Sequence, residues 1–346
     1  MNTKELLLAF SALNGVSGAE TEAAKYACEW LSNFGAVRIS PLGSLICSVC
    51  APKRGKPHIM LDAHIDEIGM IITFIEDKGF LRVGACGGVD RRVLLSSPVT
   101  VHTQTGAVNG VVCSIPPHLG KENDKNKPVD EIIIDVGASS KKNAEKLVTP
   151  GDRVTLKSNP AELLNGLVSG KALDDRAGCT AIIKALEALA GALPDCGLTA
   201  VFSSMEEVGG QGAKTAAYEV NPTHAVAVDM SFAYTPDSER KDCGELRKGP
   251  MVGFAPILDH GLSNMLCRIA EENGIPFQCE VMGGKTGTNA DWIAIAQGGV
   301  KTALLSVPLK YMHTPIETAA AEDIENTAKL LAAFVKKLAG EVCGDA

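Results

Sequence analysis

Helix-length and strand-length apolar runs alternate in the first and last parts of the chain, and this alternation predicts the fold. Two helix-like segments lie within residues 4–34, separated by the turn-forming stretch 14–18, and strand-like runs follow them. Residues 166–346 again alternate helix-like and strand-like runs, which is typical of an α/β fold with a mostly parallel, helix-covered sheet. The expected strands are 37–40, 45–49, 58–62, 198–203, 225–229 and 302–307, and the expected later helices are 177–189, 213–218, 262–272, 290–297 and 321–338.

The pattern changes between residues 67 and 165, where short β-rich runs are separated by Gly and Pro turns. We expect a small β-rich, barrel-like domain inserted into a larger one that consists of residues 1–66 and 166–346. Its glycines and its Arg91-Arg92 pair could line a site, although turns and surface charge are the favoured interpretation. The expected strands are 68–75, 80–83, 99–103, 108–112 and 132–135, with one short helix near 140–147, an exposed polar loop at 116–130, and turn glycines at Gly84, Gly87 and Gly88.

Composition narrows the functional classes. A chain of 346 residues with 45% hydrophobic content is long enough for two domains. The net charge of -8 argues against a nucleic-acid partner. No apolar stretch reaches the length of a membrane span, and the N-terminal run is too short for a secretion signal, so we expect no membrane association. The 11 cysteines are scattered singly, which favours a reducing cytoplasm over a disulfide scaffold.

Histidines and carboxylates follow the predicted strands at widely separated points of the sequence. Taken singly, each has a plain structural explanation; acids before a helix, for example, complement its dipole and cap its free N–H groups. Taken together, they are the ligand types of a two-metal hydrolase, because the carboxyl ends of parallel strands meet at one edge of a sheet. The stretches are His64 to Glu67, Asp174 with Asp175, Glu206 with Glu207, Asp229, and His313.

The chemistry of such a centre suggests roles for these residues. A pair of ions about 3.5–4 Å apart needs one shared carboxylate, and Asp174 is the residue that we expect to bridge them. Asp66 lies two residues after His64, on the same face of a strand, and can orient the His64 ring. Adjacent Glu206 and Glu207 point to different sides, so one can bind metal while the other takes a proton from metal-bound water.

Three other features are weaker evidence for a functional site. Cys47 and Cys50 have redox-motif spacing but lie within a strand-like run, so we expect them to pack in the core. Gly284-Lys285 suggests a phosphate loop, but that motif requires glycine where this chain has Cys279. His118 is the histidine outside the predicted centre that is best placed for a secondary role.

At this point the chain resembles metallopeptidase family forty-two, the tetrahedral or glutamyl aminopeptidases, some of which have been described as cellulases. The resemblance covers nearly the whole chain, in the family's order. It is carried by LDAHIDEIGMII, PPHLG, DVGASSKK, GKALDDRAGC, MEEVGGQGA, AVDMS, GGKTGTNAD and YMHTPIE.

The resemblance implies two divalent ions per subunit, with zinc or cobalt preferred and manganese also suitable. Its ligand set is His64, Asp174 and Asp229 on one ion, and Asp174, Glu207 and His313 on the other. Glu206 is implied as the general base that activates a metal-bridging water, and Asp66 as the acid that supports His64. The implied substrates are peptides with a free N-terminus. The inserted domain is implied to form dimers that build a hollow dodecamer.

The chain departs from the family at a few positions. Gly210 and Gln211 stand where Leu-Arg is common, and Asn289 stands where many members have Asp. None of these is an implied ligand, so we expect effects on substrate preference or subunit contacts.

Two rival functions remain to be weighed. A glycoside hydrolase is disfavoured, because adjacent Glu206 and Glu207 cannot readily flank a glycosidic bond from opposite sides. An oligomeric scaffold with a relict site would bind no metal and would be inactive.

Overall fold

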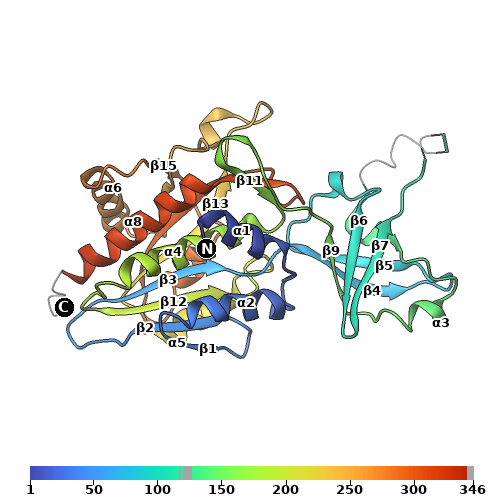
Figure 1. The fold of residues 1–346 in the computed structure, drawn as a ribbon, viewed down its shortest axis with the longest axis horizontal. Helices are drawn as coiled ribbons and strands as arrows, with labels where there is room; N and C mark the ends of the chain where they lie inside the picture. The colour runs from blue at the N-terminus through green and yellow to red at the C-terminus, as the bar shows by residue number, and fades with distance from the viewer. Residues whose placement is uncertain (117, 120–126, 341–346) are drawn as a thin grey trace.

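The computed structural model describes residues 1–116, 118–119 and 127–340. These residues form two lobes. Figure 1 shows a large α/β lobe with a smaller β lobe beside it. The chain enters the small lobe directly after the residues that follow β3 (His58–His64) and returns to the large sheet at β10 (Ala161–Glu162). The small lobe is therefore an insertion into the large one.

The large lobe contains an 11-stranded mixed sheet. Its centre is parallel, because β12, β3, β13 and β16 pair side by side in the same direction, whereas the strands at both edges are antiparallel. The main strand order is β1 (Ala36–Ile39), β2 (Leu45–Cys50), β12 (Gly197–Ser203), β3, β13 (His224–Phe232), β16 (Lys301–Lys310), β17 (Glu317–Ala320), β11 (Leu167–Gly170) and β10, with β14 (Met251–Phe254) and β15 (Gln278–Val281) beside β16.

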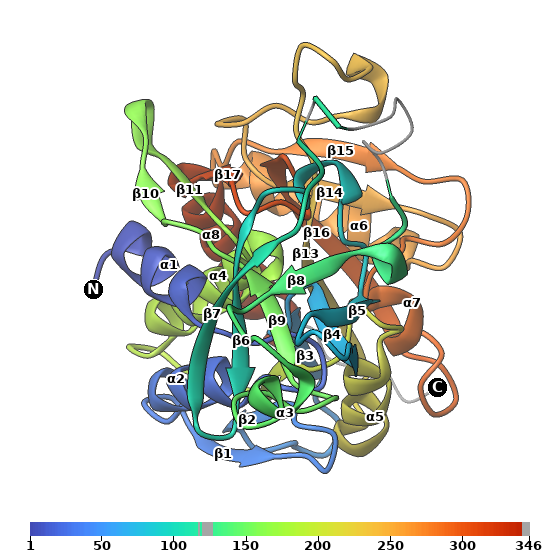
Figure 2. The same cartoon turned by 90° about the vertical axis from the view of Figure 1, so that its right-hand side faces the viewer.

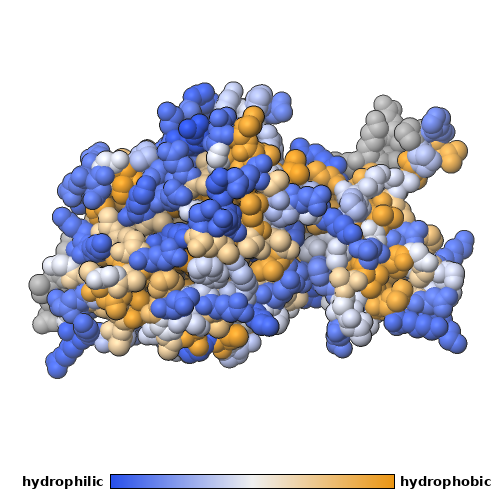
Figure 3. All heavy atoms as spheres, in the orientation of Figure 1, coloured by the Kyte–Doolittle hydropathy of each residue, from blue (hydrophilic) through white to orange (hydrophobic). Residues whose placement is uncertain are grey.

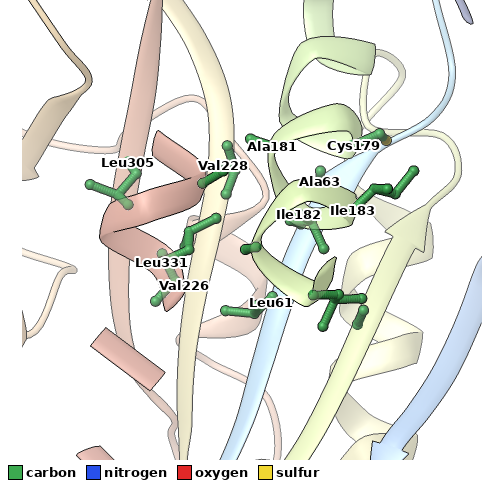
Figure 4. Close-up of a cluster of buried hydrophobic side chains, with 14 of the residues drawn as sticks. Leu61, Ala63, Cys179, Ala181, Ile182, Ile183, Val226, Val228, Leu305 and Leu331 are labelled. Atoms are coloured by element: carbon green, nitrogen blue, oxygen red, sulfur yellow. The ribbon is translucent and has the colours of Figure 1, made fainter. Parts of the chain in front are cut away.

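Alternate side chains of the central strands enter two different cores. In β3, Ile59, Leu61 and Ala63 pack with the helices of one face, while Met60 packs on the opposite face. Figure 4 shows the first of these cores, with α4 lying alongside the central strands. That face carries α1 (Thr3–Ala12), α2 (Thr21–Leu31), α4 (Leu173–Leu189), α6 (His260–Glu272) and α8 (Ala321–Ala339), and the other face carries α5 (Gln211–Val220) and α7 (Ala290–Ile293).

The small lobe is a closed six-stranded barrel with its own apolar core. Figure 2 looks at the molecule from this side and shows the barrel strands in front of the large sheet. The barrel order is β4 (Gly69–Ile75), β5 (Leu81–Cys86), β8 (Ile133–Asp135), β7 (Gly106–Val112), β6 (Pro98–Thr103) and β9 (Arg153–Leu156), with α3 (Lys141–Ala144) at its edge. Strand β9 closes the barrel by pairing with both β4 and β6.

The fold class predicted from the sequence is confirmed: a helix-covered α/β sheet with an inserted barrel. The predicted helices are present, although α7 ends at Ile293 rather than near residue 297. The short strands β9, β10, β11, β14, β15 and β17 were not predicted. Much of the expected loop 116–130 lies outside the described residues. Cys47 is buried in the core, as its place in a strand suggested. Within the described residues, every helix is too short or too polar to cross a bilayer.

Candidate metal centre

Seven of the chemically marked residues meet near the carboxyl ends of the central strands: His64, Asp66, Asp174, Glu206, Glu207, Asp229 and His313. His64 is the last residue of β3, and Asp66 follows it. Asp229 does not end its strand, as the sequence suggested, because β13 continues to Phe232. Its side chain alternates with those of Val228 and Met230, which enter the α4 core, so it faces the side of α5 and α7.

One half of the centre consists of His64 and Asp229, on adjacent strands. The His64 Nε2 atom lies 3.1 Å from Asp174 Oδ1 and 3.8 Å from Asp229 Oδ1. Both side chains are almost fully buried. Burial lowers the pKa of His64, but the hydrogen bonds to Asp174 and Asp66 outweigh it and raise this pKa well above its usual value. Burial raises the pKa of Asp229 well above its usual value.

The other half consists of Glu207 and His313, both in loops. The His313 Nε2 atom lies 3.4 Å from Asp174 Oδ2 and 3.3 Å from Glu207 Oε1. Burial opposes protonation of the His313 ring, yet the hydrogen bonds to Asp174 and Glu207 raise its pKa to about 11. Burial raises the pKa of Glu207.

Asp174 lies between the two halves and directs one carboxylate oxygen to each. Oδ1 faces His64 and Oδ2 faces His313. Burial disfavours its ionisation, but both histidines donate to it and lower its pKa. The backbone of Asp174 and Asp175 is not helical, and the peptide bond between them is cis. The direction of one oxygen to each histidine is the arrangement that a carboxylate shared by two ions requires.

The neighbouring Asp175 has a different task. It also lies close enough to His64 and Asp229 to join a donor cluster. However, its Oδ2 accepts from the His64 backbone N–H and its Oδ1 from that of Gly178. Both oxygens therefore hold the chain of β3 against the start of α4.

Asp66 connects the His64 ring to the loop of the paired acids. Its Oδ1 lies 3.4 Å from His64 Nδ1 and accepts from the Glu206 N–H, and its Oδ2 accepts from the N–H of Glu207. Ser17, in the stretch between α1 and α2, donates to Oδ2 at 2.6 Å. The carboxylate thus fixes both the imidazole and the backbone that carries Glu206 and Glu207.

Glu206 is the one acid of the group whose carboxylate accepts no hydrogen bond from the described part of the chain. Burial, followed by the charges of nearby carboxylates, raises its pKa to about 7, although His64 acts in the opposite direction. It lines the cavity beside the centre. A carboxylate with this pKa and no partner is suited to accept a proton near neutral pH.

Two glycines of the inserted barrel contact this centre, which agrees with the alternative that they line a site rather than with the favoured interpretation as turns. The Gly88 carbonyl accepts a hydrogen bond from His313 Nδ1 at 2.9 Å, which leaves Nε2 facing Asp174 and Glu207. A Cβ at Gly88 would lie 2.8 Å from that Nδ1, and one at Gly87 would lie 3.1 Å from the Glu207 Cβ. The barrel loop and the second half of the centre are therefore packed directly together.

Sequence reasoning also missed Glu317. This carboxylate is 1% exposed and accepts from the backbone N–H groups of His313, at 2.7 Å, and Asp174, at 3.2 Å. It holds the loop of His313 against the start of α4. The available signal was an acid at the end of YMHTPIE, four residues after His313, followed by an apolar run.

Two further residues that the sequence marked, His118 and Asn289, are not part of the cavity wall. His118 is exposed and is not among the residues that line the cavity. Asn289 is buried, and its amide donates to Asp62 and Ser203 beneath the centre.

The donor set fits two divalent ions. Within the described chain, the ion pairs of Asp174, Glu207 and Asp229 are formed only with the two histidines. Several buried carboxylates without a matching cation are costly, and burial accordingly raises the pKa of most of them. Imidazole nitrogens and carboxylate oxygens at this spacing suit zinc, cobalt or manganese.

A cavity of about 760 Å³ opens beside the centre. It is lined by His64, Asp174, Glu206, Glu207, Asp229 and His313, together with residues from β15, α7 and the loops next to them. Its volume is sufficient for several residues of a peptide.

Comparison with known proteins agrees with this fold and site. An aminopeptidase from the archaeon Desulfurococcus kamchatkensis superposes with a TM-score of 0.91 at 34% identity, covering 99% of this chain and 98% of that one. The TET1 peptidase of Pyrococcus horikoshii, which assembles into a tetrahedron or a large octahedral shell, gives 0.86 at 35% identity over 96% and 98%. A lysyl aminopeptidase of Pyrococcus furiosus is 35% identical over 87% of each chain.

An α/β lobe with an inserted barrel and a cluster of histidines and acids at the strand ends thus defines a peptidase. The chain belongs to the M42 glutamyl aminopeptidase family, whose model matches residues 43–330.

Proposed function

We propose that the protein is an aminopeptidase with two divalent metal ions, and that it releases N-terminal residues from peptides. The observation that carries this proposal is the division of the Asp174 carboxylate between His64 and His313. His64, Asp174 and Asp229 would hold one ion, and Asp174, Glu207 and His313 the other. Zinc and cobalt suit this set best, and manganese is also compatible.

When bound, the ions supply Lewis-acid chemistry that polarises the scissile carbonyl and acidifies the attacking water. The role of the protein is to position and to transfer protons. Glu206 accepts the proton of the attacking water and then passes it to the leaving amine. Asp66 keeps Glu206 in place by accepting a hydrogen bond from the Glu206 backbone N–H, and it orients His64. The buried acids also provide negative charge for the free α-amine of the substrate.

The two adjacent glutamates provide the test. Glu206→Gln keeps the shape of the side chain but cannot accept a proton, so the rate on an aminoacyl chromogenic substrate should fall by roughly 10²–10⁴-fold. Its metal content should stay near that of the wild type, because Glu206 is assigned to neither ion. Glu207→Gln is the matched variant and should lose one ion together with activity, and excess metal should partly restore both.

Elemental analysis and rate measurements on both variants distinguish the outcomes. If Glu206→Gln loses metal while Glu207→Gln retains it, the two roles are reversed. An N-acetylated peptide serves as the substrate control and should be cleaved far more slowly than the free one. Equal rates on both would exclude an aminopeptidase.

We also propose that the chain self-associates through its barrel lobe, with a dodecamer built from dimers as the expected assembly. Support comes from the TET1 neighbour, which forms closed shells, and from the surface of the lobe. Figure 3 shows apolar patches on this lobe, where Phe74 and Val111 are each about half exposed. Sedimentation of the purified chain tests the proposal, and a monomer at all concentrations would refute it.

A further inference from the structure

Gly210 has no side chain, and the indole of Trp292 occupies the space where one would lie. Gly210 immediately precedes α5 and has a φ of +72°, a conformation that favours glycine. A Cβ at this position would lie 2.5 Å from Trp292 Nε1 and closer still to Cδ1. The ring could therefore not keep its place beside any residue other than glycine. Gly210 is also three residues from Glu207, so the ring lies next to the loop of the paired acids.

Trp292 belongs to α7 and forms part of the cavity wall. The Lys214 ammonium lies 4.9 Å from the ring centroid, which helps to fix the ring orientation. Ile257, Met282 and Ile295 line the same cavity. These four apolar side chains line the same cavity as the candidate metal centre.

The charged side chains of this cavity, apart from the centre itself, are largely committed to the protein. Glu280 accepts hydrogen bonds from the hydroxyls of Ser231 and Ser306, one on each carboxylate oxygen. Asp291 likewise uses both oxygens to hold the loop at residues 286 and 287. Lys285 is exposed on a glycine-rich loop, where water solvates its charge.

We propose that Trp292, seated against Gly210, determines specificity for the side chain of the substrate's first residue, and that this pocket selects large uncharged side chains such as leucine, methionine and phenylalanine. This inference rests on the proposed aminopeptidase function and names its substrate class. An apolar side chain gains by leaving water against the indole and its neighbours. A charged side chain would have to be desolvated there, where Glu280 and Asp291 already accept hydrogen bonds from the protein and Lys285 is solvated.

The first experiment compares metal-loaded wild type and Trp292→Ala on aminoacyl chromogenic substrates with one leaving group. Wild type should prefer the leucyl, methionyl and phenylalanyl substrates over the glutamyl and lysyl ones. Trp292→Ala should lower kcat/KM for the preferred substrates by about 10- to 100-fold, mostly through KM, and should change the alanyl substrate little. Trp292→Leu is a milder variant and should give an intermediate loss.

The second experiment tests the contact between Gly210 and the indole. Gly210→Ala should reduce kcat/KM for the leucyl substrate in the wild type but have much less effect in the Trp292→Ala background, where no ring is displaced. Gly166→Ala is the matched control, because Gly166 has a φ of +74° and its Cβ would meet nothing within 4 Å. It carries the same backbone strain without the clash and should leave specificity unchanged.

A third measurement does not depend on turnover. Trp30 and Trp292 are the only tryptophans, so Trp30→Phe leaves Trp292 as the sole indole fluorophore. Titration of this protein with free leucine should change its emission, whereas glutamate at the same concentration should not.

The outcomes separate this inference from the proposed function. If no aminoacyl substrate is cleaved with any metal, the aminopeptidase proposal fails. If substrates are cleaved but the glutamyl one is preferred, and Lys285→Ala removes that preference, the pocket selects acidic residues and the inference is wrong. The inference would also be overturned if Gly210→Ala and Trp292→Ala had additive effects on kcat/KM. It would be overturned as well if the effect of Trp292→Ala on dipeptides depended on their second residue and not on their first.

Discussion

The two halves of the metal centre are built from different kinds of structure. His64 and Asp229, here called the deep half, belong to adjacent strands in the middle of the large sheet. Glu207 and His313, the open half, belong to loops, and the barrel loop at Gly88 completes their surroundings. The His64 side chain is 2% exposed and that of His313 is 27% exposed. Asp174 is common to both.

This difference has consequences for how the two proposed ions would be held. The strands of the deep half are fixed by neighbours on both sides, so we expect His64 and Asp229 to keep their spacing without metal. The open half depends on loop contacts from Glu317 and from the barrel. Loops with more exposed contacts open at lower free-energy cost than central strands. We therefore expect the ion of the open half to exchange faster and to be lost first on chelation.

The largest predicted effect distinguishes the two histidines. His64→Ala removes one cationic partner from the buried carboxylates of Asp66 and Asp174, so it should abolish activity and destabilise the fold by about 3–5 kcal/mol. His313→Ala should retain the ion of the deep half, and excess metal should restore part of its activity. Metal content, rates and urea unfolding of both variants provide the measurement.

The exposed His118 supplies the control for this pair, since His118→Ala should match the wild type in all three measurements. The comparison of the two halves fails if His313→Ala loses both ions while His64→Ala keeps one.

The next effect is a pH dependence of the metal-free protein. Burial raises the pKa of Glu206 from 4.5 to about 7 and that of Asp229 well above its usual value. A carboxyl whose pKa is raised on folding stabilises the fold fully below its unfolded pKa, and this contribution is lost as the pH rises through the folded pKa. For Glu206 the loss is on the order of 3 kcal/mol and falls between about pH 4.5 and 7. The raised pKa of His313 acts in the same direction at higher pH.

Bound cations remove this penalty, so the free energy of unfolding should differ more between metal-loaded and chelated protein as the pH rises. Denaturant unfolding across this range, with and without chelator, measures that difference. Asp229→Asn, in the deep half, should reduce this difference in unfolding free energy more than Glu207→Gln does. The reason is that burial raises the pKa of Asp229 further than that of Glu207. A difference that is constant with pH would show that the buried acids are not the cause.

Much of the fold was readable from the sequence because its signals are local. The run that forms β3 is buried at every position, so it reads as a central strand that delivers His64 to the edge of the sheet. Strands such as β9 and β17 have only four residues each, too few for a period to stand out. Their position is determined by pairing with other strands, and the local sequence pattern carries no information about that pairing.

The same distinction applies to the site. The implied ligands are of residue types that report their own chemistry, and the structure brings all of them together. Gly88 and Ser17 carry no such signal, because their effect arises from contacts across the fold: a carbonyl that faces His313 and a hydroxyl that faces Asp66. Asp229 was expected at the end of a strand because the apolar run stops there, yet sheet pairing with β16 continues through Met230 and beyond.

The smallest predicted effect tests whether the barrel loop supports the open half alone. In Gly88→Ala the new Cβ would lie 2.8 Å from His313 Nδ1, so the ring or the loop must shift and the carbonyl contact is weakened. Loss of such a supporting contact typically costs 10–100-fold in metal affinity, and we expect about that loss for one ion only. Gly191→Ala is the control, since a Cβ there meets nothing within 4 Å. Competition with a chromogenic chelator resolves the two affinities. Equal weakening of both ions would mean that the halves are coupled through Asp174 and that the barrel loop supports the whole centre.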